Sequence, residues 1–192
     1  MELHKKKQKI CEELGNKDGL STSLGNQAHI LYNSGHLKEA MQLRRKECKI
    51  CEEIGNKYGM QSSLGNQAVI LQALGRLEEA MELLKKKQTI CEELDNKEGL
   101  QSSLGNQANI LYAWGRLEEA MQLHKKEQKI CEELNHKDGL SISLGNQALI
   151  LQAWGRLEEA MELHKKKQKI CEEQGNRDGL RSSLGNQANI LY

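Results

Sequence analysis

The chain contains no proline and no phenylalanine, and aromatic residues make up only 3% of its 192 residues. Without proline, no backbone N–H donor is missing and no helix is forced to break. No apolar run approaches the roughly 18 residues that cross a bilayer as a helix. The net charge is only +1 at pH 7, which argues against the basic surface of a nucleic-acid-binding protein. We therefore expect neither a membrane nor a nucleic acid as partner.

The sequence repeats itself every 40 residues. The frames are 1–40, 41–80, 81–120, 121–160 and the partial frame 161–192, and the third and fourth differ at only 11 of 40 positions. A repeat of this length is typical of a solenoid, in which each unit stacks on its neighbours. We predict a single solenoid domain over residues 1–192, with a core that is buried one layer at a time.

Each repeat contains two predicted helices. In the third repeat Asn96 can cap a first helix that Gly115 ends, and a second helix runs from about Leu117 to Leu134. Because only two residues separate these helices, they must pack antiparallel. The sequence therefore predicts an all-α fold of about ten helices, with no strand.

Some polar residues fall on the faces that should be buried. A glutamine lies on the apolar stripe of every first helix, at Gln27, Gln67, Gln107, Gln147 and Gln187. An unpaired buried amide costs about 1–3 kcal/mol, so we predict a glutamine ladder with hydrogen bonds between helices. In the second helices the middle turn, such as residues 124–128, offers little to bury. The lysine-rich tracts at 5–7, 44–46 and 85–87 are predicted to form a solvated outer face.

Five of the six cysteines occupy the same position of each repeat: Cys11, Cys51, Cys91, Cys131 and Cys171. Equivalent helices two layers apart lie roughly 10 Å from each other, beyond the ~7 Å between Cα atoms that a disulfide spans. We therefore predict small buried side chains in a reducing compartment, which indicates a cytoplasmic location. Cys48 forms a C-x-x-C pair with Cys51, but no second cysteine pair or nearby histidine completes a zinc site.

The repeat resembles the tetratricopeptide repeat. The large, small, large, Gly, large and Ala positions of that family are matched by Leu104, Ala108, Leu111, Gly115, Leu117 and Ala120. The family's usual unit has 34 residues, and the longer unit here resembles the arrays of kinesin light chains, Pins-type regulators and bacterial multi-repeat proteins. Gln107, His124 and the missing closing proline depart from the pattern. The resemblance implies a right-handed α-solenoid of antiparallel helix pairs, a superhelix that binds extended peptides along a concave face lined by the first helices.

That resemblance places several polar residues on the peptide-binding face. An asparagine ladder is formed by Asn26, Asn66, Asn106, Asn146 and Asn186, whose amides can pair with a peptide backbone of any sequence. The same asparagines could instead bond to neighbouring helices and fix the stacking. Other positions on this face vary between repeats and are also predicted to contact peptide: His29, Asn109, Asn189, Tyr32, Gln72, Tyr112 and Gln152.

Two functional hypotheses remain from the sequence. The first is a scaffold that binds an extended peptide or partner segment, and the alternative is a structural spacer or self-associating filament segment with no specific ligand. We predict no enzyme activity, cofactor or metal site, because no histidine falls at i,i+4 with another ligand and no nucleophile elbow or phosphate loop is present. A second molecule placed with its Met1 after Tyr192 would nearly restore the repeat register, so we also expect weak end-to-end self-association.

Overall fold

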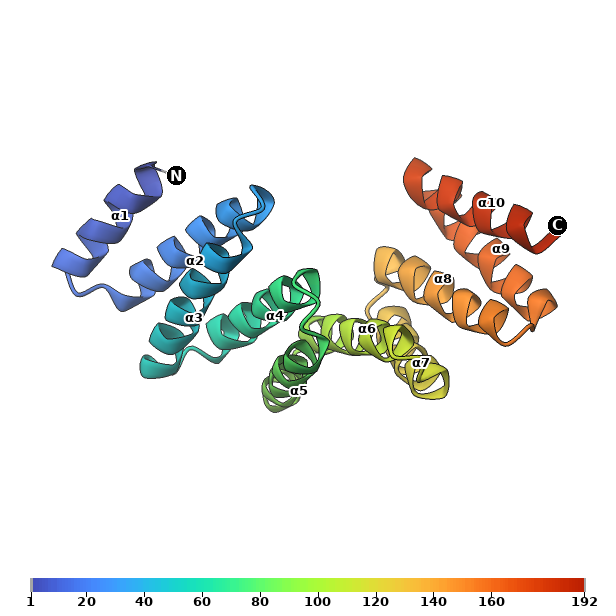
Figure 1. The fold of residues 1–192 in the computed structure, drawn as a ribbon, viewed down its shortest axis with the longest axis horizontal. Coiled ribbons are helices and arrows are strands. Elements are labelled where there is room, and N and C mark those ends of the chain that lie inside the picture. The colour runs from blue at the N-terminus through green and yellow to red at the C-terminus, as the bar shows by residue number, and fades with distance from the viewer. Residues whose placement is uncertain (1, 192) are drawn as a thin grey trace. The chain divides into compact units, whose positions relative to one another are not determined.

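The computed structural model describes residues 2–191, so Met1 and Tyr192, on which the end-to-end register depends, lie outside the described residues. Residues 2–191 form helices joined by short turns, with no strand among them (Figure 1). The elements are α1 (Glu2–Glu13), α2 (Lys17–Asn33), α3 (Leu37–Glu53), α4 (Lys57–Ala73), α5 (Leu77–Glu93), α6 (Lys97–Ala113), α7 (Leu117–Glu133), α8 (Lys137–Ala153), α9 (Leu157–Gln174) and α10 (Arg177–Leu191). Even-numbered helices are the first helices of the predicted repeats, and odd-numbered helices are the second.

The chain divides into two compact units, Met1–Ser103 and Leu104–Tyr192, and the boundary falls within α6. In the first unit each helix from α1 to α5 packs on the next, and α2 also contacts α4. In the second unit α7 to α10 pack in the same consecutive way, and α8 also contacts α10. An odd-numbered helix therefore packs against the even-numbered helices before and after it, which confirms the predicted all-α arrangement of helix pairs.

Local sequence rules set the helix ends. Asn56 caps α4 by accepting a hydrogen bond from the Gly59 N–H at 2.8 Å, as predicted for Asn96 in α6, which accepts from Gly99 at 3.0 Å. Gly115, between α6 and α7, has a φ of +72°, a left-handed conformation that glycine adopts without strain. Each chain reversal thus follows from the residues beside it.

The predicted polar and cysteine positions are buried as expected. The five repeated cysteines are all buried and free. Three ladder glutamines donate across helices at 2.8 Å: Gln27 to Gln8, Gln147 to Gln128 and Gln187 to Gln168. Serine hydroxyls add a second set of bonds from each even-numbered helix to a backbone carbonyl of the preceding helix, namely Ser23 to His4, Ser63 to Arg44, Ser103 to Leu84, Ser143 to His124 and Ser183 to His164.

The middle turn of the odd-numbered helices differs from the prediction. His124 and Glu127 are only 1% and 3% exposed, so this turn is filled rather than thin. The predicted solvated outer face is wrong for Arg44 and Lys87, which are each 8% exposed. The reason is helical spacing: these positions lie three or four residues from one another and from the buried cysteine, and therefore share its face.

Candidate functional site

A cavity opens between successive even-numbered helices in the first unit. It has a volume of about 140 Å³ and is lined by residues of α2, α3 and α4: His29, Tyr32, Arg44, Asn66, Val69 and Ile70. We call it the first pocket. The structure thus brings together three residues that the sequence placed on the binding face, His29, Tyr32 and Asn66.

The second unit holds an equivalent cavity, the second pocket. Its volume is about 30 Å³, and its lining comes from α6, α7 and α8: Asn109, Tyr112, His124, Asn146 and Leu149. Each of these residues lies 80 positions after its counterpart in the first pocket. The pockets therefore follow a period of two repeats, with tyrosine and asparagine retained and with valine replaced by the larger leucine.

A buried basic residue from an odd-numbered helix contributes to each pocket. The Arg44 guanidinium forms an ion pair with Glu47 at 2.9 Å. In the second unit His124 Nδ1 lies 2.8 Å from Glu127 Oε2, with both side chains almost fully buried. A carboxylate beside each basic group neutralises charge that would otherwise be costly to bury.

Glycines on the even-numbered helices make room for these carboxylates. A Cβ added to Gly25 would lie 2.5 Å from Glu47 Oε1, and one on Gly105 would collide with Glu127 Oε1. The carboxylate therefore lies directly against the backbone of the neighbouring helix. This close approach explains a glycine in the middle of a helix, where it otherwise costs stability.

The same helical position carries lysine in the alternate repeats. Lys87 Nζ donates to Ser102 Oγ at 2.8 Å, and Lys167 Nζ lies 3.4 Å from Ser182 Oγ. Burial lowers the pKa of Lys87 because it disfavours the charged ammonium. Beside Lys167, His164 is 0% exposed, and neither of its ring nitrogens has a hydrogen-bond partner among residues 2–191.

The asparagine ladder occupies the exposed side of the even-numbered helices. Asn26 is exposed, and Asn66, Asn106, Asn146 and Asn186 are half-buried. Asn66 Nδ2 donates to the Ser62 carbonyl at 2.9 Å, and Asn146 Nδ2 donates to Asn109 Oδ1 at 3.1 Å. The second bond joins α8 to α6, as the stacking alternative requires, while the first stays within one helix.

The remaining predicted contact residues also lie on this side. Tyr112, Asn189 and His29 are exposed, and Tyr32, Gln72 and Gln152 are half-buried. Neither Gln72 nor Gln152 lines the first or second pocket. The contributions of Arg44 and His124 were missed by sequence reasoning, although their spacing of seven residues from Cys51 and Cys131 was a readable signal.

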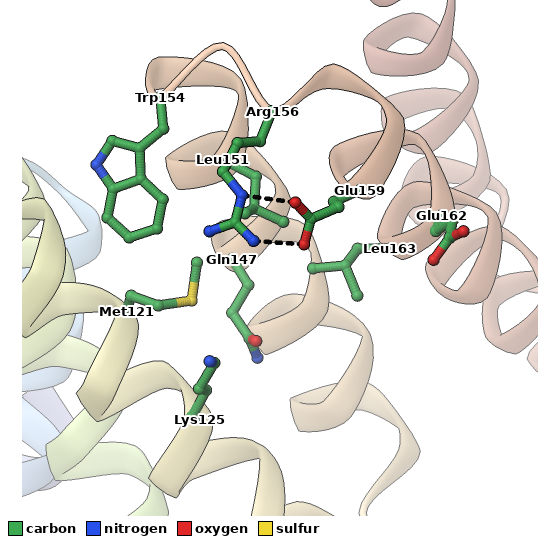
Figure 2. Close-up of a pocket in the computed structure, with 9 residues that line it drawn as sticks. All are labelled: Met121, Lys125, Gln147, Leu151, Trp154, Arg156, Glu159, Glu162 and Leu163. Carbon is green, nitrogen blue, oxygen red and sulfur yellow. Dashed lines mark hydrogen bonds and ion pairs between the residues drawn. The ribbon is translucent and has the colours of Figure 1, made fainter.

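A further cavity of about 210 Å³ lies between α7 and α9, over α8 (Figure 2). Arg156 donates two hydrogen bonds of 2.6 Å to Glu159, and its guanidinium carbon lies 5.9 Å from the centre of the Trp154 ring. Met121 and Lys125 line the opposite wall (Figure 2). This cavity was not predicted, and its exposed charges are already paired in part by one another.

Comparison with known proteins confirms the resemblance read from the sequence. Residues 59–133 match the family model of the tetratricopeptide repeat. No curated protein matches the chain. Because the remaining frames repeat nearly the same text as the matched segment, the tetratricopeptide pattern extends to both sides of it.

Solved structures show the same fold at low sequence identity. Aspartyl phosphate phosphatase F from Bacillus subtilis has 17% identity and a TM-score of 0.85, and the match covers 89% of this chain and 45% of that one. A signal transduction ATPase with numerous domains and a tetratricopeptide repeat sensor, from Pyrococcus horikoshii, has 16% identity and a TM-score of 0.84, covering 97% and 29%. The nearly identical repeats of a putative kinesin light chain from Podosopora anserina have 21% identity and a TM-score of 0.73, covering 88% and 84%. The chain thus spans less than half of the first two proteins.

Two searches of the described residues bear on other classes of site. In residues 2–191 no group of three or more histidine, cysteine, aspartate or glutamate side chains is arranged to hold a metal ion. No described helix combines the length and apolar character that a membrane span requires.

Proposed function

We propose that this protein is a non-catalytic scaffold that binds an extended segment of a partner protein along its even-numbered helices. One observation carries the proposal: pocket-lining side chains converge from successive even-numbered helices, and the arrangement recurs 80 residues later. The tetratricopeptide pattern supports it, because its groove-lining helices correspond to the even-numbered helices here.

The pockets and the asparagines have complementary roles in this proposal. An asparagine amide offers a donor and an acceptor, so it can pair with peptide backbone whatever the side chains are. The first pocket combines the Tyr32 ring and Val69 with the polar tips of His29 and Asn66, which suits a single medium-sized side chain. Backbone pairing would supply affinity, and the pockets would supply selectivity.

Alanine substitutions test the proposal directly. A random peptide library is panned against the wild-type chain, and a selected peptide is titrated against the N66A/N146A variant. We expect at least ~10-fold weaker binding, which corresponds to about 1.4 kcal/mol for two lost backbone contacts. The matched control is Q42A/Q122A, since Gln42 and Gln122 are exposed on odd-numbered helices.

The outcome also separates the two roles of the asparagines. If N66A/N146A unfolds more easily but each folded molecule binds the peptide as well as wild type, the ladder is structural. The Asn146–Asn109 bond is the observation that favours this alternative. Failure to select any peptide would refute the binding proposal itself.

Self-association is the second candidate function, and it depends on exposed apolar side chains. Leu3 and Leu14 on α1 are 78% and 75% exposed, and Leu191 on α10 is 76% exposed. A contact between α10 of one copy and α1 of another would repeat the helix packing seen within each unit, and it would propagate rather than close. Sedimentation over a wide concentration range tests it, and a strictly monomeric species would exclude it.

A further inference from the structure

The buried charge of the odd-numbered helices alternates in sign from one repeat to the next. The equivalent residues are Glu47, Lys87, Glu127 and Lys167. Each glutamate forms an ion pair with the basic residue three positions before it. The lysines have Leu84 and His164 at that position, and neither lysine forms an ion pair with a carboxylate of residues 2–191. Each compact unit therefore contains one neutralised pair and one ammonium group without a counterion.

Each of these lysines lies between two even-numbered helices. Lys87 extends from α5 past Gly65 of α4, where an added Cβ would lie 3.1 Å from its Nζ, to Ser102 of α6. Its ammonium thus sits between α4 and α6, one helix pair along from the first pocket between α2 and α4.

The second unit repeats this order. Lys167 passes Gly145 of α8, again with its Nζ 3.1 Å from an added Cβ, and reaches towards Ser182 of α10. The second pocket lies one helix pair before it, between α6 and α8. Each unit therefore presents the same two-part surface, a pocket followed by a lysine.

A buried ammonium without a counterion is costly, because burial removes its hydration and the single hydroxyl of Ser102 replaces only part of it. The chain carries a neutral solution at the equivalent position of α3, where Arg44 and Glu47 pair. An external carboxylate at the lysine would provide the missing counterion and a charge-assisted hydrogen bond.

We propose that the partner segment is acidic, with one carboxylate side chain paired with Lys87 in the first unit and another paired with Lys167 in the second. This inference rests on the proposed peptide-binding function and specifies its ligand. Neighbouring packed helices lie about 8–10 Å apart, and an extended chain advances about 3.3–3.6 Å per residue. Each acidic residue should therefore lie about three residues from the side chain that occupies the pocket.

Variants that borrow arrangements from other repeats test this inference without leaving an unpaired charge. L84R/K87E places in α5 the Arg–Glu pair of α3. K167E gives His164 the carboxylate that His124 has in α7. The matched controls are K86E and K166E, because Lys86 and Lys166 are exposed residues of the same two helices. All variants are checked for helical circular dichroism and for thermal midpoint.

A random library of 16-residue peptides is panned against wild type, against the combined L84R/K87E/K167E variant and against the K86E/K166E control. We expect aspartate and glutamate to be enriched with wild type and the control, and to lose their enrichment with the combined variant. A peptide selected on wild type should bind the combined variant at least ~10-fold more weakly, and the control no more than ~2-fold more weakly at 0.15 M salt.

The outcomes distinguish the inference from the function on which it rests. If no peptide is enriched on any variant, the proposed function is refuted. If peptides are enriched but are not acidic, or bind the folded combined variant as well as wild type, the scaffold function stands and the lysine assignment is wrong.

Discussion

Replacing His164 by leucine should stabilise the protein. His164 is fully buried, and neither ring nitrogen has a hydrogen-bond partner among residues 2–191. An unsatisfied buried polar group costs about 1–3 kcal/mol. Leucine has no such group, and Leu84 occupies the equivalent position of α5 with 0% exposure. We therefore expect H164L to raise the free energy of unfolding by about 2 kcal/mol, or roughly 30-fold in the equilibrium constant.

The same residue gives the protein a pH dependence of defined sign. Burial, together with the nearby charge of Lys167, lowers the pKa of His164 below its ordinary value of 6.5. Below pH 6.5 the unfolded chain then binds a proton that the folded chain does not, so stability falls as the pH falls. The H164L variant lacks this loss. In K167E a carboxylate would favour the protonated ring, raise the pKa and weaken the acid sensitivity.

Urea unfolding followed by circular dichroism at pH 8.0, 6.5 and 5.5 measures both effects. With a urea dependence of about 1–3 kcal/mol per molar, the H164L midpoint should rise by about 1 M at pH 8.0 and by more at pH 5.5. The control is H29N, since His29 is exposed and asparagine stands at the equivalent Asn109. An H164L variant less stable than wild type, or one with an unchanged pH profile, would refute the reasoning.

Three further predictions use matched positions within the chain and the same unfolding assay. H136N should stabilise by about 1 kcal/mol, because His136 caps α8 without a side-chain hydrogen bond whereas asparagine makes one at the equivalent cap of α4; an unchanged midpoint would count against it. G105A should destabilise by roughly 1–3 kcal/mol by displacing Glu127, whereas G185A, with open space around it, should stabilise by up to ~1 kcal/mol; equal effects would contradict the packing argument. E47Q should cost about 3–5 kcal/mol by leaving Arg44 unpaired, and E79Q, in an exposed pair, at most ~1 kcal/mol; similar costs would show that burial is not decisive.

The helices could be predicted because their ends follow local rules. Asn96 caps α6 and Gly115 ends it, and both effects depend on residues within one turn. The buried glutamines and cysteines were also predictable, since their position on the apolar stripe follows from helical spacing alone.

Burial of the charged residues could not be predicted in the same way. Lys87 belongs to a run of three lysines, and all three have the same chemistry in the sequence. Only the approach of Gly65 from another helix creates the space that one of them fills. That approach is a tertiary contact between residues 22 positions apart. The pockets depend on the same contacts, so the sequence placed their exposed rims correctly but not Arg44 and His124.

Two periods therefore coexist in this chain, and they serve different purposes. The backbone follows 40 residues, because the serine–carbonyl bonds and the glycine beside each buried charge recur in nearly every repeat. The buried pair itself takes three forms, Arg44–Glu47, Leu84–Lys87 and His124–Glu127, without a change in the helices that carry it. Since a hydroxyl bond to a backbone carbonyl does not depend on the side chain of the acceptor residue, the stacking tolerates this exchange. The charge presented between the even-numbered helices can consequently vary at an 80-residue period while the fold stays constant, which is the property that a scaffold with a specific ligand requires.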